Sequence, residues 1–70
     1  MRAPTTMPIV KLTGEDGNAF GIMGKVKRVL RANGADQEYI NKYLQESMTG
    51  DYNHLLSTAM RYVDVRWERR

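Results

Sequence analysis

The chain contains no cysteine and a single histidine among its 70 residues, and this restricts how so small a domain can be stabilised. A chain of this length buries only about 60% of the surface that its unfolded form exposes. Small domains therefore commonly rely on disulfides, a structural metal or a partner chain. The lack of cysteine excludes disulfides and thiolate metal sites, and one histidine argues against an imidazole metal site. We therefore expect no metal and no cofactor, and we expect self-association to supply buried surface.

The charge and hydropathy of the chain indicate its partners. Eleven lysines and arginines stand against eight acidic residues, which gives a formal net charge of +3. This charge favours an anionic partner but is weaker than that of a protein that packages DNA. No apolar run approaches the roughly 20 residues that span a membrane, and the first residues lack the apolar stretch of a signal peptide. We expect a cytoplasmic protein with no membrane partner, a flexible tail over residues 1–8, and Met7 as an alternative start to Met1.

The hydrophobic pattern predicts a strand, three helices and a strand, in that order. These elements are expected over residues 9–13, 18–33, 36–47, 51 to about 63, and 63–68. Asp36 and Asp51 are the expected N-caps of the second and third helices, and Gly34 is the expected C′ residue of the first. The predicted fold is one α+β domain over residues 9–68, followed by a basic end at 69–70. A two-stranded sheet has open edges, which a second copy of the chain is expected to complete.

Each predicted element carries one apolar face, and these faces define the expected core. The inward residues are Val10 and Leu12 in the first strand; Ala19, Ile22, Met23, Val26, Val29 and Leu30 in the first helix; Ile40, Tyr43, Leu44 and Met48 in the second; Leu55, Leu56, Ala59, Met60 and Val63 in the third; and Val65 and Trp67 in the last strand. Among the aromatic residues, Phe20, Tyr43 and Trp67 are expected in the core or at an interface.

The first helix has glycines on the side opposite its apolar face. At about 100° per residue, Gly17, Gly21, Gly24, Arg28 and Arg31 gather on that side. Each glycine inside a helix costs roughly 1 kcal/mol relative to alanine, so two of them on a solvated face require an explanation. One is close packing against a helix of another subunit, and a second is a ligand that approaches past the missing side chains. The third is a glycine turn and helix cap followed by a basic face that only meets solvent.

The ligand interpretation predicts an anion site along this helix. Backbone N–H groups and the helix dipole favour an anion at a helix N-terminus, and the basic side chains extend that preference. The turn is neither a P-loop nor a dinucleotide fingerprint, and Glu15 and Asp16 disfavour an anion there. The predicted ligand-binding residues are Gly14, Gly17, Asn18, Gly21, Gly24, Lys25, Arg28 and Arg31. The predicted interface residues are Phe20, Gly21, Gly24 and Trp67.

No spacing in the sequence indicates a catalytic centre. His54 follows Asp51 by three residues, which fits either a hydrogen-bonded dyad or a helix cap beside a half-exposed histidine. Ser57 lies one turn further along. A serine, a histidine and an aspartate so close in sequence are no triad, because triads recruit their members from distant segments. We therefore expect a protein that is not an enzyme.

The remaining aromatic and basic residues allow two interpretations each. Tyr39, Tyr52 and Tyr62 are candidates for stacking on a base, or they are amphipathic residues at the rim of the core. Arg69 and Arg70 contact phosphates, or they form a charged solubilising end.

Three segments resemble a known group of proteins. They are residues 11–20 (KLTGEDGNAF), 49–56 (TGDYNHLL) and 60–63 (MRYV). They resemble small uncharacterised proteins of bacteriophage and prophage genomes, over about residues 9–68. The resemblance implies a setting in the cytoplasm of a host bacterium and no particular activity. Phage proteins of this size commonly block a host protein, sequester a signalling nucleotide or bind nucleic acid.

These observations together predict a homo-oligomer that sequesters a phosphate-bearing, nucleotide-like ligand and thereby counters host defence. One alternative is a nucleic-acid-binding regulator that lays Lys25, Lys27, Arg28 and Arg31 across phosphates, with an affinity that falls steeply with salt. The acidity of the second helix argues against its entering a groove of DNA. Another alternative is an inhibitor of a host protein that uses the glycine face or a strand edge.

Overall fold

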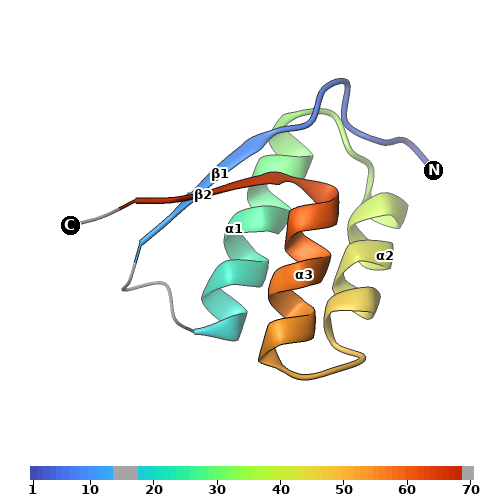
Figure 1. Cartoon of the computed structure of the whole chain (residues 1–70). Coiled ribbons are helices and arrows are strands. Elements are labelled where there is room, and N and C mark those ends of the chain that lie inside the picture. The colour runs from blue at the N-terminus through green and yellow to red at the C-terminus, as the bar shows by residue number, and fades with distance from the viewer. Residues whose placement is uncertain (14–17, 69–70) are drawn as a thin grey trace.

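Two short strands from opposite ends of the chain pair with each other and lie across a layer of helices (Figure 1). In this computed structural model, which describes residues 1–13 and 18–68, the elements are β1 (Ile9–Leu12), α1 (Ala19–Ala32), α2 (Gln37–Ser47), α3 (Tyr52–Tyr62) and β2 (Asp64–Trp67). The predicted α+β fold and the order of its five elements are confirmed.

The two strands are parallel, and their pairing places β1 beside β2 in a fixed register. Ile9 lies opposite Asp64 and Leu12 opposite Trp67. A parallel pair needs a long crossover between its strands, and the three helices form it. β1 packs on α1 and β2 packs on α3, whereas α2 packs on both other helices and on neither strand. The side chains of α1 that face away from the other elements are consequently open to solvent.

Side-chain caps fix where each helix begins. Asn18 accepts a hydrogen bond from the Phe20 N–H at 2.8 Å. Asp36 and Asp51 cap α2 and α3 in the same way, with the backbone N–H three residues further along at 2.9 Å in both cases. Such caps satisfy backbone donors that have no partner inside the helix. The two predicted aspartate caps are confirmed.

Gly34 ends α1 in the conformation that the sequence predicts. Its φ is +100°, a region that side chains with a Cβ avoid. The N–H of Gly34 donates to the Arg31 carbonyl, and the N–H of Ala35 donates to the Leu30 carbonyl. These two bonds are those of a Schellman motif, and the buried Ala35 brings the chain directly into α2.

The core lies between the sheet and the helices and contains most of the predicted residues. The buried apolar residues are Val10, Leu12, Ile22, Met23, Val26, Leu30, Ala35, Ile40, Tyr43, Leu55, Ala59, Tyr62 and Val63. Val10 and Leu12 thus share the buried side of β1, as predicted, and Ile9 is exposed.

The prediction that Met48 and Met60 lie in the core is wrong, and of the two environments predicted for Trp67, core or interface, its exposure excludes the core. Met48 and Met60 are 61% and 60% exposed, and Trp67 is 54% exposed. Met48 follows the last turn of α2, so it no longer belongs to the helical face. The inward face of α3 runs through Leu55, Thr58, Ala59 and Tyr62, and this spacing turns Met60 outward. Trp67 ends β2 on the helix-facing side, and burial along β2 decreases toward it.

The segment before β1 contacts the connection between α1 and α2. The Thr5 N–H donates to the Asn33 carbonyl, and the Asp36 N–H donates to the Arg2 carbonyl, both at 3.1 Å. The N-terminal ammonium lies 2.8 Å from a Glu38 carboxylate oxygen. Pro8 is buried, and its carbonyl accepts the Asp64 N–H. The flexibility expected for residues 1–8 stays a prediction.

Two glycine-to-alanine substitutions should change stability in opposite directions. Gly34→Ala forces a Cβ into a positive-φ position and should lower the free energy of unfolding by about 1–2 kcal/mol. Gly24→Ala should raise it by about 1 kcal/mol, because nothing lies within 4 Å of the added Cβ. Urea denaturation measures both values. Equal changes in the free energy of unfolding for the two variants would contradict the positive φ of Gly34 and the helical, open position of Gly24.

Candidate functional site

The exposed face of α1 is basic and carries Lys27, Arg28 and Arg31. The helix contains four cations, Lys25, Lys27, Arg28 and Arg31, and no acidic residue. The buried positions of the same helix hold its other face against the core; they are Ile22, Met23, Val26 and Leu30. This strong separation of faces fixes the rotation of α1, because any other rotation would bury cations. The sequence therefore dictates which side of α1 meets solvent.

A shallow groove on this face joins several of the predicted ligand-binding residues. It is lined by Gly24, Lys27, Arg28, Arg31 and Ala32. Gly24 lies in its wall with open space where a Cβ would be, so the helix backbone is accessible there. Among the residues that the structure describes, no acidic residue lines the groove. The groove therefore has the charge and the backbone access that an anion requires.

Sequence reasoning did not assign Lys27 and Ala32 to the ligand site. Lys27 lies three residues after Gly24 and Ala32 four residues after Arg28. On a helix this spacing places side chains on one face, so the signal was present. The nucleic-acid alternative includes Lys27. The predicted ligand site does not, because its residues were chosen on the side of the helix that carries the glycines.

Three other predicted ligand residues, Asn18, Gly21 and Lys25, lie outside the groove. Asn18 uses its side chain as the N-cap of α1, and Gly21 is exposed one turn before Gly24. Lys25 turns toward the sheet, where its Nζ donates to the Lys11 carbonyl at 3.2 Å. Gly14 and Gly17 lie outside the described residues. The groove is thus a feature of the C-terminal half of α1 and not of its N-terminus.

Within the groove, one arginine is held in place by α2, and two cations form no ion pair in the part of the chain that the structure describes. The Arg31 guanidinium donates to the Gln37 side chain at the start of α2, and Gln37 in turn donates to Asn41. Lys27 and Arg28 form no ion pair within residues 1–13 and 18–68. Three like charges on adjacent turns repel one another, and a bound anion would relieve that repulsion.

The predicted interface residues are all exposed but do not form one surface. Phe20 is 78% exposed at the start of α1, and Trp67 is exposed at the end of β2. Phe20 lies one turn before Gly24 on the same side of α1. It therefore lies beyond the end of the groove that is nearer the N-terminus of the helix. It also borders a second, mainly apolar hollow with Met23, Met48 and Tyr52.

The tyrosines proposed for base stacking serve mainly the core. Tyr62 packs edge-on against Tyr39 and Tyr43, with ring centroids 5.4 Å and 5.2 Å apart. Edge-to-face pairs of this kind stabilise aromatic clusters. Tyr52 is the one of the three candidates on the surface, where it borders the apolar hollow. The interpretation as amphipathic residues at the core therefore holds for Tyr39 and Tyr62.

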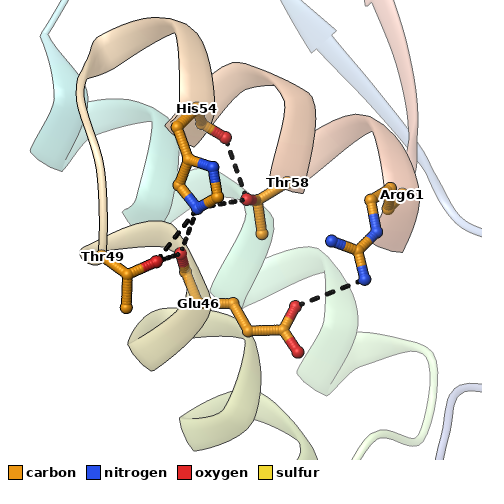
Figure 2. A network of polar contacts seen from close by, with 5 residues as sticks. All are labelled: Glu46, Thr49, His54, Thr58 and Arg61. Carbon is orange, nitrogen blue, oxygen red and sulfur yellow. Dashed lines mark hydrogen bonds and ion pairs between the residues drawn. The ribbon is translucent and has the colours of Figure 1, made fainter.

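His54 connects α2 to α3 and forms no dyad with Asp51. The Asp51 carboxylate accepts the backbone N–H of His54. Figure 2 shows the His54 ring directed at the end of α2, with Nε2 at 2.8 Å from the Glu46 carbonyl and 3.1 Å from Thr49 Oγ1. Thr58 Oγ1 lies 3.4 Å from the same nitrogen. The cap interpretation of Asp51 is confirmed.

The hydrogen-bond partners of this network assign the tautomer of His54. Thr49 Oγ1 donates to the Glu46 carbonyl and Thr58 Oγ1 donates to the His54 carbonyl. Each hydroxyl has a single hydrogen, so both oxygens offer only lone pairs to Nε2, as does the carbonyl. Nε2 must therefore carry a proton. His54 thus caps the last turn of α2 and has a structural role.

The described residues contain no arrangement typical of a metal site. Within residues 1–13 and 18–68, no three histidine, aspartate or glutamate side chains gather closely enough to hold a metal ion. In the same residues, no helix is long and apolar enough to cross a membrane. Ser57 is exposed on α3. The basic groove is therefore the candidate functional site.

No protein-family model matches this chain, and comparison with curated proteins and with solved structures finds no match. The resemblance to phage proteins stays a prediction. The assignment of a function accordingly depends on the geometry and charge of the groove.

Alkaline pH should reveal the buried environment of Tyr62. Burial, followed by the neighbouring Glu46 carboxylate, raises the pKa of Tyr62 to about 12, and burial also raises the pKa of Tyr43. Because the folded-state pKa of Tyr62 is raised, its contribution to stability is complete below pH 10 and is lost as pH rises toward 12. Ultraviolet absorbance of tyrosinate should show late ionisation in the folded protein that Tyr62→Phe reduces. Ionisation of every tyrosine near pH 10 in the folded state would contradict this environment.

The position of His54 leaves no room for a side chain at residue 50, so we expect that the fold requires Gly50. An added Cβ at residue 50 would lie 2.8 Å from both Cβ and Cγ of His54, so the ring and its bonds to α2 must shift. Gly50→Ala should lower the free energy of unfolding by about 1–3 kcal/mol, as measured in urea. Gly21→Ala is the matched control, because the nearest atom to its added Cβ is 3.8 Å away. A Gly50→Ala variant as stable as the wild-type chain would show that the network tolerates displacement.

Proposed function

We propose that this chain is a non-catalytic binding protein whose α1 groove holds a phosphate-bearing, nucleotide-like ligand. The observation that supports the proposal is the joint lining of one groove by Gly24, Lys27, Arg28 and Arg31. Phosphates bind strongly to arginine side chains because guanidinium groups donate paired hydrogen bonds to their oxygens. The groove supplies two arginines and a lysine, and none of its lining residues in the described part of the chain is a carboxylate.

Gly24 has a direct role in this proposal. An alanine at this exposed helical position would stabilise the helix and would meet no other atom. The glycine is therefore not required by packing within the chain. It leaves room for a ligand to lie against the helix backbone beside the arginines, so the loss of helix stability is offset when the ligand binds.

The exposed Phe20 supports a nucleotide over inorganic phosphate. Phe20 precedes Arg28 by two turns, which is about 12 Å along the axis at 1.5 Å per residue. This separation suits a base stacked on the ring while the phosphates reach the arginines. The ring is open to such a contact because most of its surface is exposed. Sequestration of a signalling nucleotide by this groove would counter a host defence that depends on it.

Single-stranded nucleic acid is the second candidate, favoured by the shape of the groove. The groove lies on the surface of one exposed helix, so its ends are open and a backbone of several phosphates can continue past it. Electrostatic contacts of this kind make affinity strongly dependent on salt. A mononucleotide held by the same cations depends less on salt because it carries fewer phosphates.

Binding of nucleotides and of a single-stranded oligonucleotide should depend on Arg28 and Arg31. The double variant Arg28→Ala/Arg31→Ala should lower affinity at least about tenfold, measured by titration calorimetry with mono- and dinucleotides and by fluorescence anisotropy with a labelled oligonucleotide. Lys42→Ala/Arg61→Ala is the matched control, since it removes the same charge from exposed positions on α2 and α3.

The two candidates differ in their salt dependence. For the oligonucleotide, the slope of log affinity against log salt should decrease by about 1.4 in the double variant, at about 0.7 for each phosphate that an arginine no longer neutralises. A preference for mononucleotides with a shallow slope supports the sequestration proposal. If neither ligand class binds, or if the control weakens binding as much as the groove variant does, the assignment of the groove is wrong.

A further inference from the structure

The backbone groups on the outer edge of β2 can be identified from the ladder. The Asp64 N–H donates to the Pro8 carbonyl at 2.8 Å, and the Glu68 N–H donates to the Leu12 carbonyl at 2.7 Å. Along a strand, backbone groups point alternately to the two edges. Asp64, Arg66 and Glu68 therefore face β1, and the N–H and carbonyl groups of Val65 and Trp67 point to the opposite edge.

The two outer edges of the sheet differ in their protection. At the outer edge of β1, Lys25 reaches over from α1 and donates to the Lys11 carbonyl. A lysine at this position blocks the approach of another strand. Within the described residues the sheet has two strands, so no strand from that part of the chain pairs with the outer edge of β2. The exposed Trp67 lies at the end of this edge.

The charges on β2 are arranged to match a second copy of the same strand. Asp64 and Arg66 lie on the side of the sheet opposite Val65, and Arg66 Nε and Nη2 lie 3.1 Å and 2.8 Å from Asp64 Oδ2. Two parallel copies in register would place Asp64 opposite Asp64 and Arg66 opposite Arg66. Two antiparallel copies can instead place each aspartate opposite an arginine. With Val65 opposite the partner's Val65, Asp64 faces the partner's Arg66 and Arg66 faces the partner's Asp64.

Backbone geometry is compatible with the same register. Because Val65 points its backbone groups outward, the two Val65 residues form a hydrogen-bonded pair in this arrangement. Asp64 and the partner's Arg66 then form a non-hydrogen-bonded pair, in which side chains are closest. The smallest shifts that preserve the hydrogen bonds move the centre to residue 64 or residue 66. Either shift places two aspartates or two arginines opposite each other.

We propose that β2 pairs antiparallel with β2 of a second copy, centred on Val65, and so forms a four-stranded sheet in the order β1-β2-β2-β1. On the neighbouring strand, Lys11 lies directly opposite Arg66 and has its own acid, Glu68, at 3.5 Å, so it does not compete for the partner's Asp64. The partner's Asp64 supplies an acid on the other side of Arg66. This inference goes beyond the ligand proposed above and does not rest on it.

Sedimentation equilibrium of the whole chain from about 1 µM to about 1 mM tests the dimer. Asp64→Arg and Arg66→Asp each place like charges opposite each other twice, because the interface is symmetric. Each should shift the dimer midpoint to at least about tenfold higher concentration. The two variants change net charge in opposite directions, so a common loss of dimer cannot be an effect of net charge. Lys42→Asp is the control, since Lys42 lies on α2, which contacts neither strand.

Restoration of pairing separates the proposed register from damage to the fold. An equimolar mixture of Asp64→Arg with Arg66→Asp places two arginines opposite two aspartates and should form a heterodimer. The double variant Asp64→Arg/Arg66→Asp should regain the homodimer. A wild-type chain that stays monomeric throughout overturns the proposal. So do single variants that dimerise as wild type does, and so does failure of both the mixture and the double variant to restore pairing.

Discussion

The parallel pairing of β1 with β2 is the interaction on which the rest of the structure depends. It joins residues more than 50 positions apart, so the three helices between them must form a crossover that returns the chain to its start. Parallel strands require such a crossover, and its closure costs entropy that grows slowly with its length. The buried sides of β1 and of the helices offset this cost through apolar contacts around Leu12, Ile22 and Tyr43. A sheet of two strands has two outer edges, and the chain protects them differently.

The rotation of α1 links stability to the candidate site. Ile22, Met23, Val26 and Leu30 hold one side of the helix against the core, and the same rotation turns Gly24, Arg28 and Arg31 to solvent. A cation on the boundary between the two faces, Lys25, reaches the edge of the sheet instead. One amphipathic helix thereby supports the core, covers an exposed strand edge and presents a basic groove.

Local signals in the sequence were sufficient for the elements, whereas tertiary contacts decided the rest. Asp36, Asp51 and Gly34 act through bonds within a few residues, so their roles could be predicted without knowledge of the fold. Met48 and Met60 could not be placed, because hydrophobicity alone does not distinguish an inward position from its neighbour at a helix end. Ser47 and Thr58 are buried instead, where small side chains occupy the inward faces of α2 and α3. The sequence was sufficient to predict the helix that carries the candidate site and three of the residues that line it. The direction of the Lys25 side chain depends on β1, so helical periodicity could not predict it.

The candidate groove and the proposed dimer edge lie on different elements, so assembly and ligand binding do not compete for the same surface. The groove belongs to α1, which packs on β1, whereas the open edge belongs to β2, which packs on α3. In the proposed four-stranded sheet, β1 is the outer strand of each protomer, so each α1 lies under an outer strand and away from the two-fold axis. Assembly then leaves both grooves open and gives the dimer two sites. Two sites at a fixed separation bind a ligand with several phosphates more tightly than one site, provided that the ligand spans both. Dimerisation would therefore increase the affinity for an extended nucleic acid but would leave the affinity for a mononucleotide unchanged.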